Sequence, residues 1–366
     1  MSEPTNEKPE PTRLVVLYGG QSAEHDVSRL SARHVIAAID PDRYEIDPIA
    51  ITPDGRWVRS DATVVALAEG VHTLPESLDA TGTALVPQAS VAPLREGQQV
   101  VVLPILHGPR GEDGAVQGLL ELADAAYVGS GVLGSAANMD KVMSKVVAAA
   151  AGLPIVKHLA IRDTSVDDAF LARVGDGLGW PVFVKPANMG SSVGVSRADD
   201  VPALAKALAE ALAFDEWAVV EEAVTAREIE VGVLGNEAPR ASVPGEIVPT
   251  HEFYDYEDKY LDGAARMVIP ADLPADVAEQ ARALAVQAFV ALRCDGLARA
   301  DFFYEEGPGG RGLLFNEINT MPGFTPFSMF PSLWAATGLG YAELIDELVA
   351  LALARHARRT PHRRQR

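Results

Sequence analysis

The chain alternates between short apolar runs, which predict buried strands, and longer amphipathic stretches, which predict helices. An apolar run at 13–18 (RLVVLY) predicts a strand, followed by a glycine turn at 19–20 and a helix. We expect the core face of that helix to carry Val27, Leu30, Val35 and Ala38. Further apolar runs at 44–51 and 101–106 predict two more strands. This order predicts an open, Rossmann-like α/β domain over residues 12–137, with ligands beyond the strand ends.

The rest of the chain predicts two α+β units. Helical patterns at 138–150 and 166–172 and strand patterns at 180–186 and 217–224 predict a unit over residues 138–224. A strand at 228–235, a long helix at 274–293, a hairpin at 299–319 and a terminal helix near 341–356 predict a third unit over 225–354. The polar, proline-rich arm 1–11 and the arginine-rich tail 355–366 are predicted to be disordered.

The hairpin carries the first candidate chemistry. With its turn centred near Gly309, antiparallel pairing sets Asp301 opposite Glu317 and Arg299 opposite Asn319, all on one face. Two facing carboxylates repel each other unless a cation lies between them. Oxygen ligands of these types suit Mg²⁺, which commonly bridges to phosphates. A solvated hairpin face is the alternative interpretation.

Composition limits the classes of partner. A chain of 366 residues with 48% hydrophobic residues can bury a large core, and a formal net charge of −20 argues against general binding to nucleic acid or an anionic membrane. The single cysteine, Cys294, favours a buried thiol in a reducing cytosol. The sequence contains neither a membrane span nor the apolar core of a signal peptide, so we expect a soluble cytoplasmic protein that binds small ligands.

Two glycine-rich loops follow predicted strands. The stretch 17–28 (LYGGQSAEHDVS) lacks the GxGxxG pattern, which argues against a dinucleotide site. Its Glu24 either caps the following helix or binds a ligand. The loop 106–114 (LHGPRGEDG) allows close backbone approach to a ligand and supplies His107, Glu112 and Asp113.

Later stretches suggest a nucleotide site. The run 185–195 (KPANMGSSVGV) offers Lys185 and backbone N–H groups that could wrap phosphate, although such runs are commonly plain loops. Lys141 is either a second phosphate ligand or a solvated lysine. The strand end 219–224 (VVEEAV) could contact an adenine edge and Glu228 a ribose, and a plain surface loop is an equally good interpretation. The polar, aromatic stretch 251–263 is typical of a functional loop or lid.

Seven motifs in order resemble the D-alanine–D-alanine ligase family of ATP-grasp enzymes, from about residue 13 to 350. They are GGQSAEHDVS, LHGPRGEDG, GSG…NMDK, VKPANMGSSVGV, EFYDYEDKY, GLARADFF and FNEINTMPGFTPFSMFP. The resemblance implies an ATP-grasp fold preceded by the Rossmann-like domain, with ATP between the second and third units. It implies ligation of two D-alanines through a D-alanyl phosphate for peptidoglycan precursor synthesis, in a homodimer.

The resemblance also implies roles for individual residues. For ATP, it assigns Lys141, Lys185 and Lys259 to the phosphates, the backbone of Glu221, Glu222 and Val224 to adenine, and Glu228 to the ribose. For two Mg²⁺ ions, which Mn²⁺ could replace, it assigns Asp301, Glu317 and Asn319. For D-alanine, it assigns Glu24 and His107 to the first molecule, Arg299 and Gly323 to the oxyanion, and Ser328 and Met329 to the second carboxylate.

The acceptor is the finer question. Ser191 would link Glu24 to Tyr260 and help close the lid. Relatives that prefer D-lactate differ in the lid, and Asp258-Lys259-Tyr260 is typical of the peptide-forming type. We therefore expect D-alanyl-D-alanine, with D-lactate or another D-amino acid as the alternative acceptor. A non-catalytic nucleotide-binding protein is disfavoured because the metal ligands and Arg299 are all present.

Overall fold

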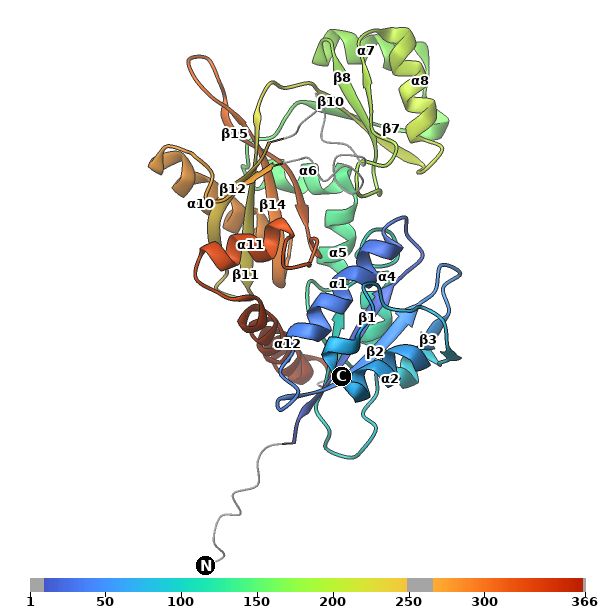
Figure 1. The fold of residues 1–366 in the computed structure, drawn as a ribbon. Coiled ribbons are helices and arrows are strands. Elements are labelled where there is room, and N and C mark those ends of the chain that lie inside the picture. The colour runs from blue at the N-terminus through green and yellow to red at the C-terminus, as the bar shows by residue number, and fades with distance from the viewer. Residues whose placement is uncertain (1–9, 249–265, 365–366) are drawn as a thin grey trace, which may run out of the picture.

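The computed structural model describes residues 10–248 and 266–364, and these residues form three lobes, each built on one β-sheet (Figure 1). The N-terminal lobe is blue and teal, the central lobe green to yellow-green, and the C-terminal lobe yellow to red. The three sheets fall within the three sequence ranges expected for the units. The mixed α/β architecture agrees with the predicted fold class.

The first sheet is the predicted Rossmann-like sheet. Its strands are β1 (Thr12–Gly19), β2 (Tyr44–Ile51), β3 (Trp57–Arg59), β4 (Thr83–Ala84), β5 (Val100–Pro104) and β6 (Ala126–Tyr127). Their order is β4-β3-β2-β1-β5-β6, and β2, β1, β5 and β6 run parallel. The helices of this lobe are α1 (His25–Ala38), α2 (Asp61–Glu69), η1 (Val71–Thr73), α3 (Pro87–Ser90) and α4 (Ala115–Leu122).

Both faces of this sheet are covered, which is why β1 is apolar throughout. Alternate residues of β1 enter two separate cores, one shared with α1 and one shared with α4. Helix α1 uses the predicted face only in part: Val35 is buried and Ala38 packs against the core, but Leu30 is 40% exposed. The buried positions are Ser28, Ser31, Ala32, Val35 and Ile36. The small side chains allow close packing, and Ser28 Oγ accepts a hydrogen bond from Gly19 N at 2.8 Å.

The central lobe has a four-stranded sheet of order β7-β10-β8-β9. Its elements are β7 (His158–Arg162), η2 (Asp163–Ser165), α7 (Asp168–Leu178), β8 (Val182–Pro186), β9 (Ser196–Ala198), α8 (Val201–Ala211) and β10 (Trp217–Glu222). Helices α7 and α8 pack on one face of the sheet through Phe170, Val174, Leu204 and Leu208. The opposite face is left for the cleft.

The C-terminal lobe has a five-stranded antiparallel sheet of order β13-β12-β11-β14-β15. Its elements are β11 (Arg227–Gly235), β12 (Arg240–Val248), β13 (Arg266–Val268), α10 (Ala275–Ala291), β14 (Gly296–Glu305), β15 (Gly312–Asn319) and α11 (Met329–Ala336). Helix α10 covers one face through Ala281, Ala285, Ala288 and Phe289, and Cys294 is buried in the same core as predicted.

Two helices, α5 (Val132–Met139) and α6 (Lys141–Ala150), connect the N-terminal lobe to the central lobe (Figure 1). The sequence predicted one helix over 138–150. The break occurs because Asp140 has an extended backbone and caps α6, accepting hydrogen bonds from Val142 N at 2.9 Å and Met143 N at 3.0 Å. This cap begins a new helix whose first residue is Lys141.

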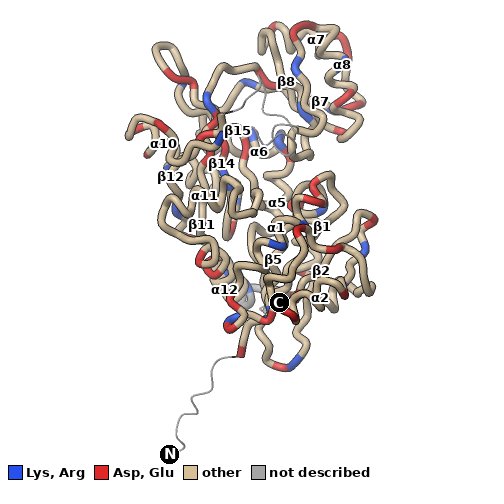
Figure 2. The backbone as a smooth tube through the Cα atoms, in the orientation of Figure 1, with Lys and Arg blue, Asp and Glu red and all other residues tan. Residues whose placement is uncertain are grey.

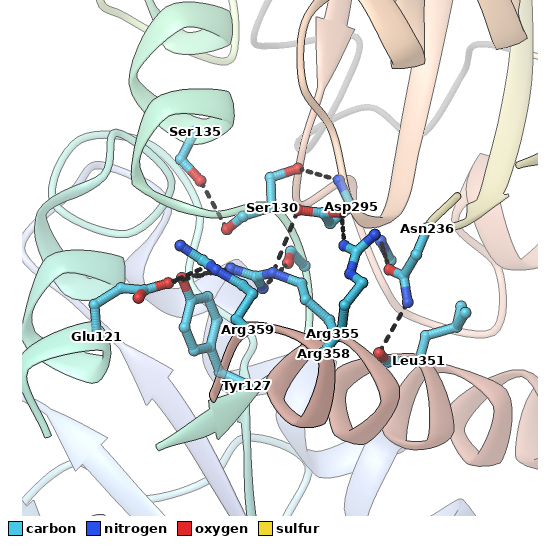
Figure 3. Close-up of polar contacts among 12 residues, drawn as sticks. Glu121, Tyr127, Ser130, Ser135, Asn236, Asp295, Leu351, Arg355, Arg358 and Arg359 are labelled. Carbon is cyan, nitrogen blue, oxygen red and sulfur yellow. Dashed lines mark hydrogen bonds and ion pairs between the residues drawn. The ribbon is translucent and has the colours of Figure 1, made fainter. Parts of the chain in front are cut away.

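The prediction of a disordered tail from residue 355 is wrong for the described residues, since helix α12 runs over Tyr341–Arg364. Leu344, Ile345 and Leu348 of α12 enter the core on the α1 side of the first sheet. Beyond them, Arg355 is 4% exposed and its guanidinium contacts the N-terminal lobe (Figure 3). The arginine-rich sequence is ordered here because buried acceptors face it.

Acidic and basic positions are intermixed in all three lobes (Figure 2). None of the helices in the described part of the chain combines the length and apolar character needed to span a membrane.

Candidate active site

One face of the C-terminal sheet gathers the charged residues that the sequence singled out. Asp301 of β14 pairs with Glu317 of β15, and Arg299 pairs with Asn319, so the predicted register is confirmed. On the other side of β14, Glu230 of β11 pairs with Asp301. Three carboxylates therefore occupy one row across neighbouring strands, because directly paired residues share a face.

A β-bulge produces this register. Phe302 pairs with Phe315, whereas Asp301 pairs with Glu317, so Asn316 is an extra residue in β15. Between the bulge and the turn, each residue of β14 pairs with the β15 residue one position earlier than the predicted register places opposite it. A regular hairpin closed by this turn would place Glu317 opposite Ala300, on the buried face. The bulge turns Glu317 to the same face as Asp301.

The guanidinium of Arg299 fills the space between two of these carboxylates. Its Nε lies 2.8 Å from Glu230 Oε2 and from Asp301 Oδ1, and its Nη2 lies 2.7 Å from Asp301 Oδ2. Burial opposes the charge, but Asp301 and Glu230 outweigh it and raise the pKa of Arg299 well above its usual range. A permanent cation with donors held in a fixed fork is suited to stabilise a developing oxyanion.

The donor set on this face fits a magnesium ion. Asn319 Nδ2 donates to Asp301 Oδ2 at 2.8 Å, so the two side chains lie side by side next to Glu317. Within the described ranges, no group of three or more histidine, cysteine, aspartate or glutamate side chains is arranged to hold a metal by itself. Mg²⁺ takes one or two carboxylates and completes its coordination with phosphate and water oxygens, so two carboxylates and an amide suffice when phosphate is present.

Two lysines share one buried carboxylate across the cleft from this row. Glu221 of β10 is 3% exposed, and its two oxygens lie 2.8 Å from Lys145 Nζ and 2.8 Å from Lys185 Nζ. Burial opposes the ionisation of Glu221, but the two ammonium groups outweigh it and lower its pKa. Burial lowers the pKa of Lys185 as well, but Glu221 and Glu317 more than offset this and raise it. Lys185 therefore stays charged beside the cleft.

The other predicted nucleotide residues lie around these lysines. Lys141 Nζ lies 3.9 Å from Glu317 Oε2 and donates to Met189 O at 2.5 Å. Glu222 Oε1 accepts from Lys157 N at 2.7 Å and from Arg311 Nη1 at 2.6 Å, so these two contacts hold the carboxylate. Val224 lies just beyond β10. Glu228 is on the cleft face of β11 and contributes to the raised pKa of Lys185.

Glu24 links the N-terminal lobe to the glycine-serine loop of the central lobe. Ser191 Oγ donates to Glu24 Oε1 at 2.5 Å. Ser191 and Ser192 have φ of 50° and 58°, a left-handed conformation that costs free energy in residues other than glycine and often marks functional loops. A Cβ at Gly108 or Gly190 would meet Glu24 Oε2 at 2.9 or 3.1 Å. These glycines leave the carboxylate accessible.

His107 and Glu112 lie on the loop after β5. His107 is 5% exposed and its Nδ1 is 3.0 Å from Met321 O, while its Nε2 has no hydrogen-bond partner among the described residues. A buried ring nitrogen of this kind is suited to contact a ligand. Glu112 accepts from Gly108 N at 2.7 Å. Burial, and then the charge of Glu24, raise the pKa of Glu112 to about 8.

The proposed oxyanion glycine and the second-substrate residues lie together before α11. A Cβ at Gly323 would lie 3.2 Å from Ser328 Oγ, so glycine keeps this corner open. Ser328 Oγ accepts from Thr325 N at 3.1 Å. The side chain of Met329 packs in a small core with Ile247 and Leu333, so only its backbone could meet a substrate. Lys259 and Tyr260 lie outside the described residues.

Sequence reasoning missed two residues of this site. Glu230 could have been found, because it follows Glu228 by two positions on a strand and so shares its face. Lys145 had no comparable signal: it follows Lys141 by one helical turn, yet its partners come from β10 and β15. Only the packing of the lobes brings those strands to it.

Comparisons with known proteins agree with this geometry. The family described as D-ala D-ala ligase matches with its N-terminal model at residues 13–130 and its C-terminal model at 147–350. A D-alanine--D-alanine ligase of Kineococcus radiotolerans is 49% identical over 371 residues, covering 95% of this chain and 98% of its own length.

Solved structures are similar over nearly the whole chain. The D-alanine-D-alanine ligase from Coxiella burnetii has a TM-score of 0.80 and 35% identity, covering 97% of each chain. The VanG D-Ala:D-Ser ligase from Enterococcus faecalis has a TM-score of 0.80 and 31% identity, covering 94% of this chain and 100% of its own.

Proposed function

This chain belongs to the D-alanine–D-alanine ligase family, and we propose that its cleft joins two D-alanines with ATP to form D-alanyl-D-alanine, a peptidoglycan precursor. The enzyme is thus a ligase that forms a C–N bond. One observation carries the proposal: Arg299, Asp301, Glu317 and Asn319 share one face of a hairpin that faces the buried lysine cluster. Phosphoryl transfer requires cations and oxygen ligands in this arrangement.

The reaction proceeds in two steps. The carboxylate of the first D-alanine attacks the γ-phosphorus of ATP and displaces ADP, forming an acyl phosphate. The amine of the second D-alanine then attacks the acyl carbon, loses a proton and expels inorganic phosphate through a tetrahedral intermediate. Activation is needed because a free carboxylate is a poor electrophile.

The first substrate is held by the N-terminal lobe. Glu24 binds its ammonium group, and His107 offers its unpartnered Nε2 to the same molecule. Arg299 and the backbone N–H of Gly323 donate to the oxyanion, and one such donor typically contributes about 3 kcal/mol to transition-state stabilisation. Ser328 and the backbone of Met329 receive the second carboxylate.

The nucleotide lies between the central and C-terminal lobes. Lys141, Lys185 and Lys259 contact its phosphates, the backbone of Glu221–Val224 contacts adenine, and Glu228 contacts the ribose. Asp301, Glu317 and Asn319 would hold two Mg²⁺ ions, for which Mn²⁺ could substitute. When bound, such ions neutralise phosphate charge and align the transferred group.

A second candidate function changes only the acceptor. The similarity to a D-Ala:D-Ser ligase at 31% identity means that this fold accommodates a different second substrate in a relative. Asp258-Lys259-Tyr260 favours the dipeptide, and Ser191 and Tyr260 close the lid over the intermediate and exclude water. We place the enzyme in the cytoplasm and expect a homodimer through the N-terminal lobe, which sedimentation equilibrium would test.

Coupled measurement of ADP release tests the proposed function. We expect release to require D-alanine and Mg²⁺, and mass spectrometry with D-alanine, D-serine and D-lactate in competition to give mainly D-alanyl-D-alanine. ADP release that is undiminished without any D-amino acid would contradict the proposal. Mainly ester or D-seryl product would favour the second candidate.

Replacing Glu317 by alanine tests the metal assignment. We expect kcat to fall at least about 100-fold, since the lost group would stabilise charge only when nucleotide is bound. Thermal stability should hold or rise, because the substitution removes one of two facing acids. Glu306→Ala, on the same hairpin at a side chain that is 56% exposed, is the control and should keep near-normal turnover. A Glu317→Ala enzyme with wild-type kcat would refute the assignment.

A further inference from the structure

Lys145 contacts both halves of the proposed nucleotide site without reaching the open cleft. Its side chain is 1% exposed and projects from α6. Its Nζ lies 2.8 Å from Glu221 Oε1 in the central lobe and donates to Asn316 O of the C-terminal lobe at 3.0 Å. A buried ammonium with two such partners is held in place by both.

The first contact is with the β-bulge. Asn316 is the extra residue of β15, since the pairing with β14 passes from Phe315 to Glu317, and its carbonyl accepts from Lys145 Nζ. Lys145 provides a charged donor to this oxygen. Leu313, Phe315 and Ile318 of β15 all enter the core. Because their spacing is uneven, all three side chains can face the core only if the bulge stays at Asn316. Lys145 therefore stabilises the register in which Glu317 faces Asp301.

The second contact sets the charge beside Lys185. With both lysines protonated, Lys145, Lys185 and Glu221 together carry a net charge of +1, since one carboxylate is shared between two ammonium groups. Burial lowers the pKa of Lys145, and the charge of Glu221 opposes this. Without Lys145, Glu221 would neutralise Lys185 alone, and no net positive charge would remain for phosphate. With Lys145 present, Glu221 is shared between the two lysines, so Lys185 keeps part of its positive charge for phosphate.

We infer that Lys145 is a positioning residue of the ATP site, which holds the Asn316 bulge for the metal-ligand face and balances Glu221 so that Lys185 can bind phosphate. The inference rests on the proposed function, because it takes Lys185 and Glu317 as parts of the nucleotide site. Lys145 itself touches no substrate. Its two effects separate experimentally, since one depends on charge and the other on the backbone of β15.

The test measures binding of fluorescent N-methylanthraniloyl-ADP to the full-length chain, without and with Mn²⁺, with Mn²⁺ binding followed by electron paramagnetic resonance. In Lys145→Met we expect metal-free ADP affinity to fall about tenfold, as for loss of a charged contact. The increase in ADP affinity on adding Mn²⁺ should also shrink. Lys206→Met, at a lysine that is 80% exposed on α8, is the control and should match wild type.

A double variant separates the two effects and guards against misfolding. Lys145→Met with Glu221→Gln removes the fully buried ammonium together with the carboxylate that it pairs with, so it should fold, and Lys185, whose side chain is 14% exposed, keeps a net charge of +1 beside the cleft. We expect it to recover metal-free ADP affinity to within about threefold of wild type, while the weakened response to Mn²⁺ persists because the bulge is still unsupported.

Several results would overturn the inference. Folded Lys145→Met with wild-type ADP and Mn²⁺ binding would remove both roles. A double variant that fails to recover metal-free affinity would overturn the charge-balance role, and one with a full wild-type Mn²⁺ response would overturn the bulge role. Wild-type protein that binds no ADP at all would instead overturn the proposed function.

Discussion

Glu112 illustrates how much a single residue depends on its neighbours. In the sequence it is one acid of the loop 106–114, and in the structure its carboxyl lies under that loop with Gly108 N donating to it at 2.7 Å. Burial and the nearby charge of Glu24 raise its pKa to about 8. A neutral carboxyl beside an ionised one avoids repulsion next to the site proposed for the first substrate.

Stability should therefore depend on pH through Glu112. The folded protein binds this proton more tightly than the unfolded chain does, so the free energy of unfolding should fall as pH rises from about 4.5 to about 8. Glu112→Gln cannot lose a proton, and the variant should lose less stability over that range. Urea unfolding at several pH values measures both slopes, and equal slopes in the two proteins would contradict the raised pKa.

Among the elements, α6 has the most direct effect on the site, because it places Lys141 beside the cleft and, one turn later, the buried Lys145 behind it. Its start is defined by Asp140, whose side chain accepts from two N–H groups of the first turn. The hairpin of β14 and β15 shows a related dependence on local backbone geometry. The alternation of apolar and polar residues predicted its two strands. The core positions Leu313, Phe315 and Ile318 are two and then three residues apart, because the bulge adds one residue between the last two.

Removing the cap of α6 should affect stability and nucleotide binding together. Asp140→Ala should lower the free energy of unfolding by about 1 kcal/mol and raise KM for ATP, since Lys141 lies in the frayed turn. Asp200→Ala is the matched control, because Asp200 caps α8 through Ala203 N at 2.8 Å. It should cost similar stability without changing KM. Equal KM changes in the two variants would contradict a specific role for α6.

At the scale of the whole molecule, α12 joins the first lobe to the last. Arg355 donates to Gly129 O at 2.7 Å and to Tyr127 Oη at 2.8 Å, and its Nε lies 3.3 Å from Asp295 Oδ2 at the start of the C-terminal hairpin (Figure 3). The guanidinium also stacks over the Tyr127 ring at 4.4 Å. These contacts fix the orientation of the N-terminal lobe relative to the C-terminal sheet.

Arg355→Ala should destabilise the protein by about 3 kcal/mol, because it leaves buried acceptors and acids without their partner. Arg358→Ala, on the same helix at a side chain that is 44% exposed, should cost less than about 1 kcal/mol. Chemical denaturation of both variants provides the comparison. Similar losses for the two arginines would show that the buried network is not what joins the lobes.

Alternation and motif order are local properties of the chain, so they were enough to predict strands such as β1, β2 and β11, the pairing of Asp301 with Glu317, and the family, but not short edge strands such as β3, β9 and β13. Only the folded structure showed the helical end of α12 and the place of Lys145 between two lobes. The physical reason is that the local sequence predicts a charged side chain to be solvated, whereas long-range packing can bury it beside a partner. A run of arginines or a lone lysine carries no sign in the sequence of the acids and carbonyls that will meet it.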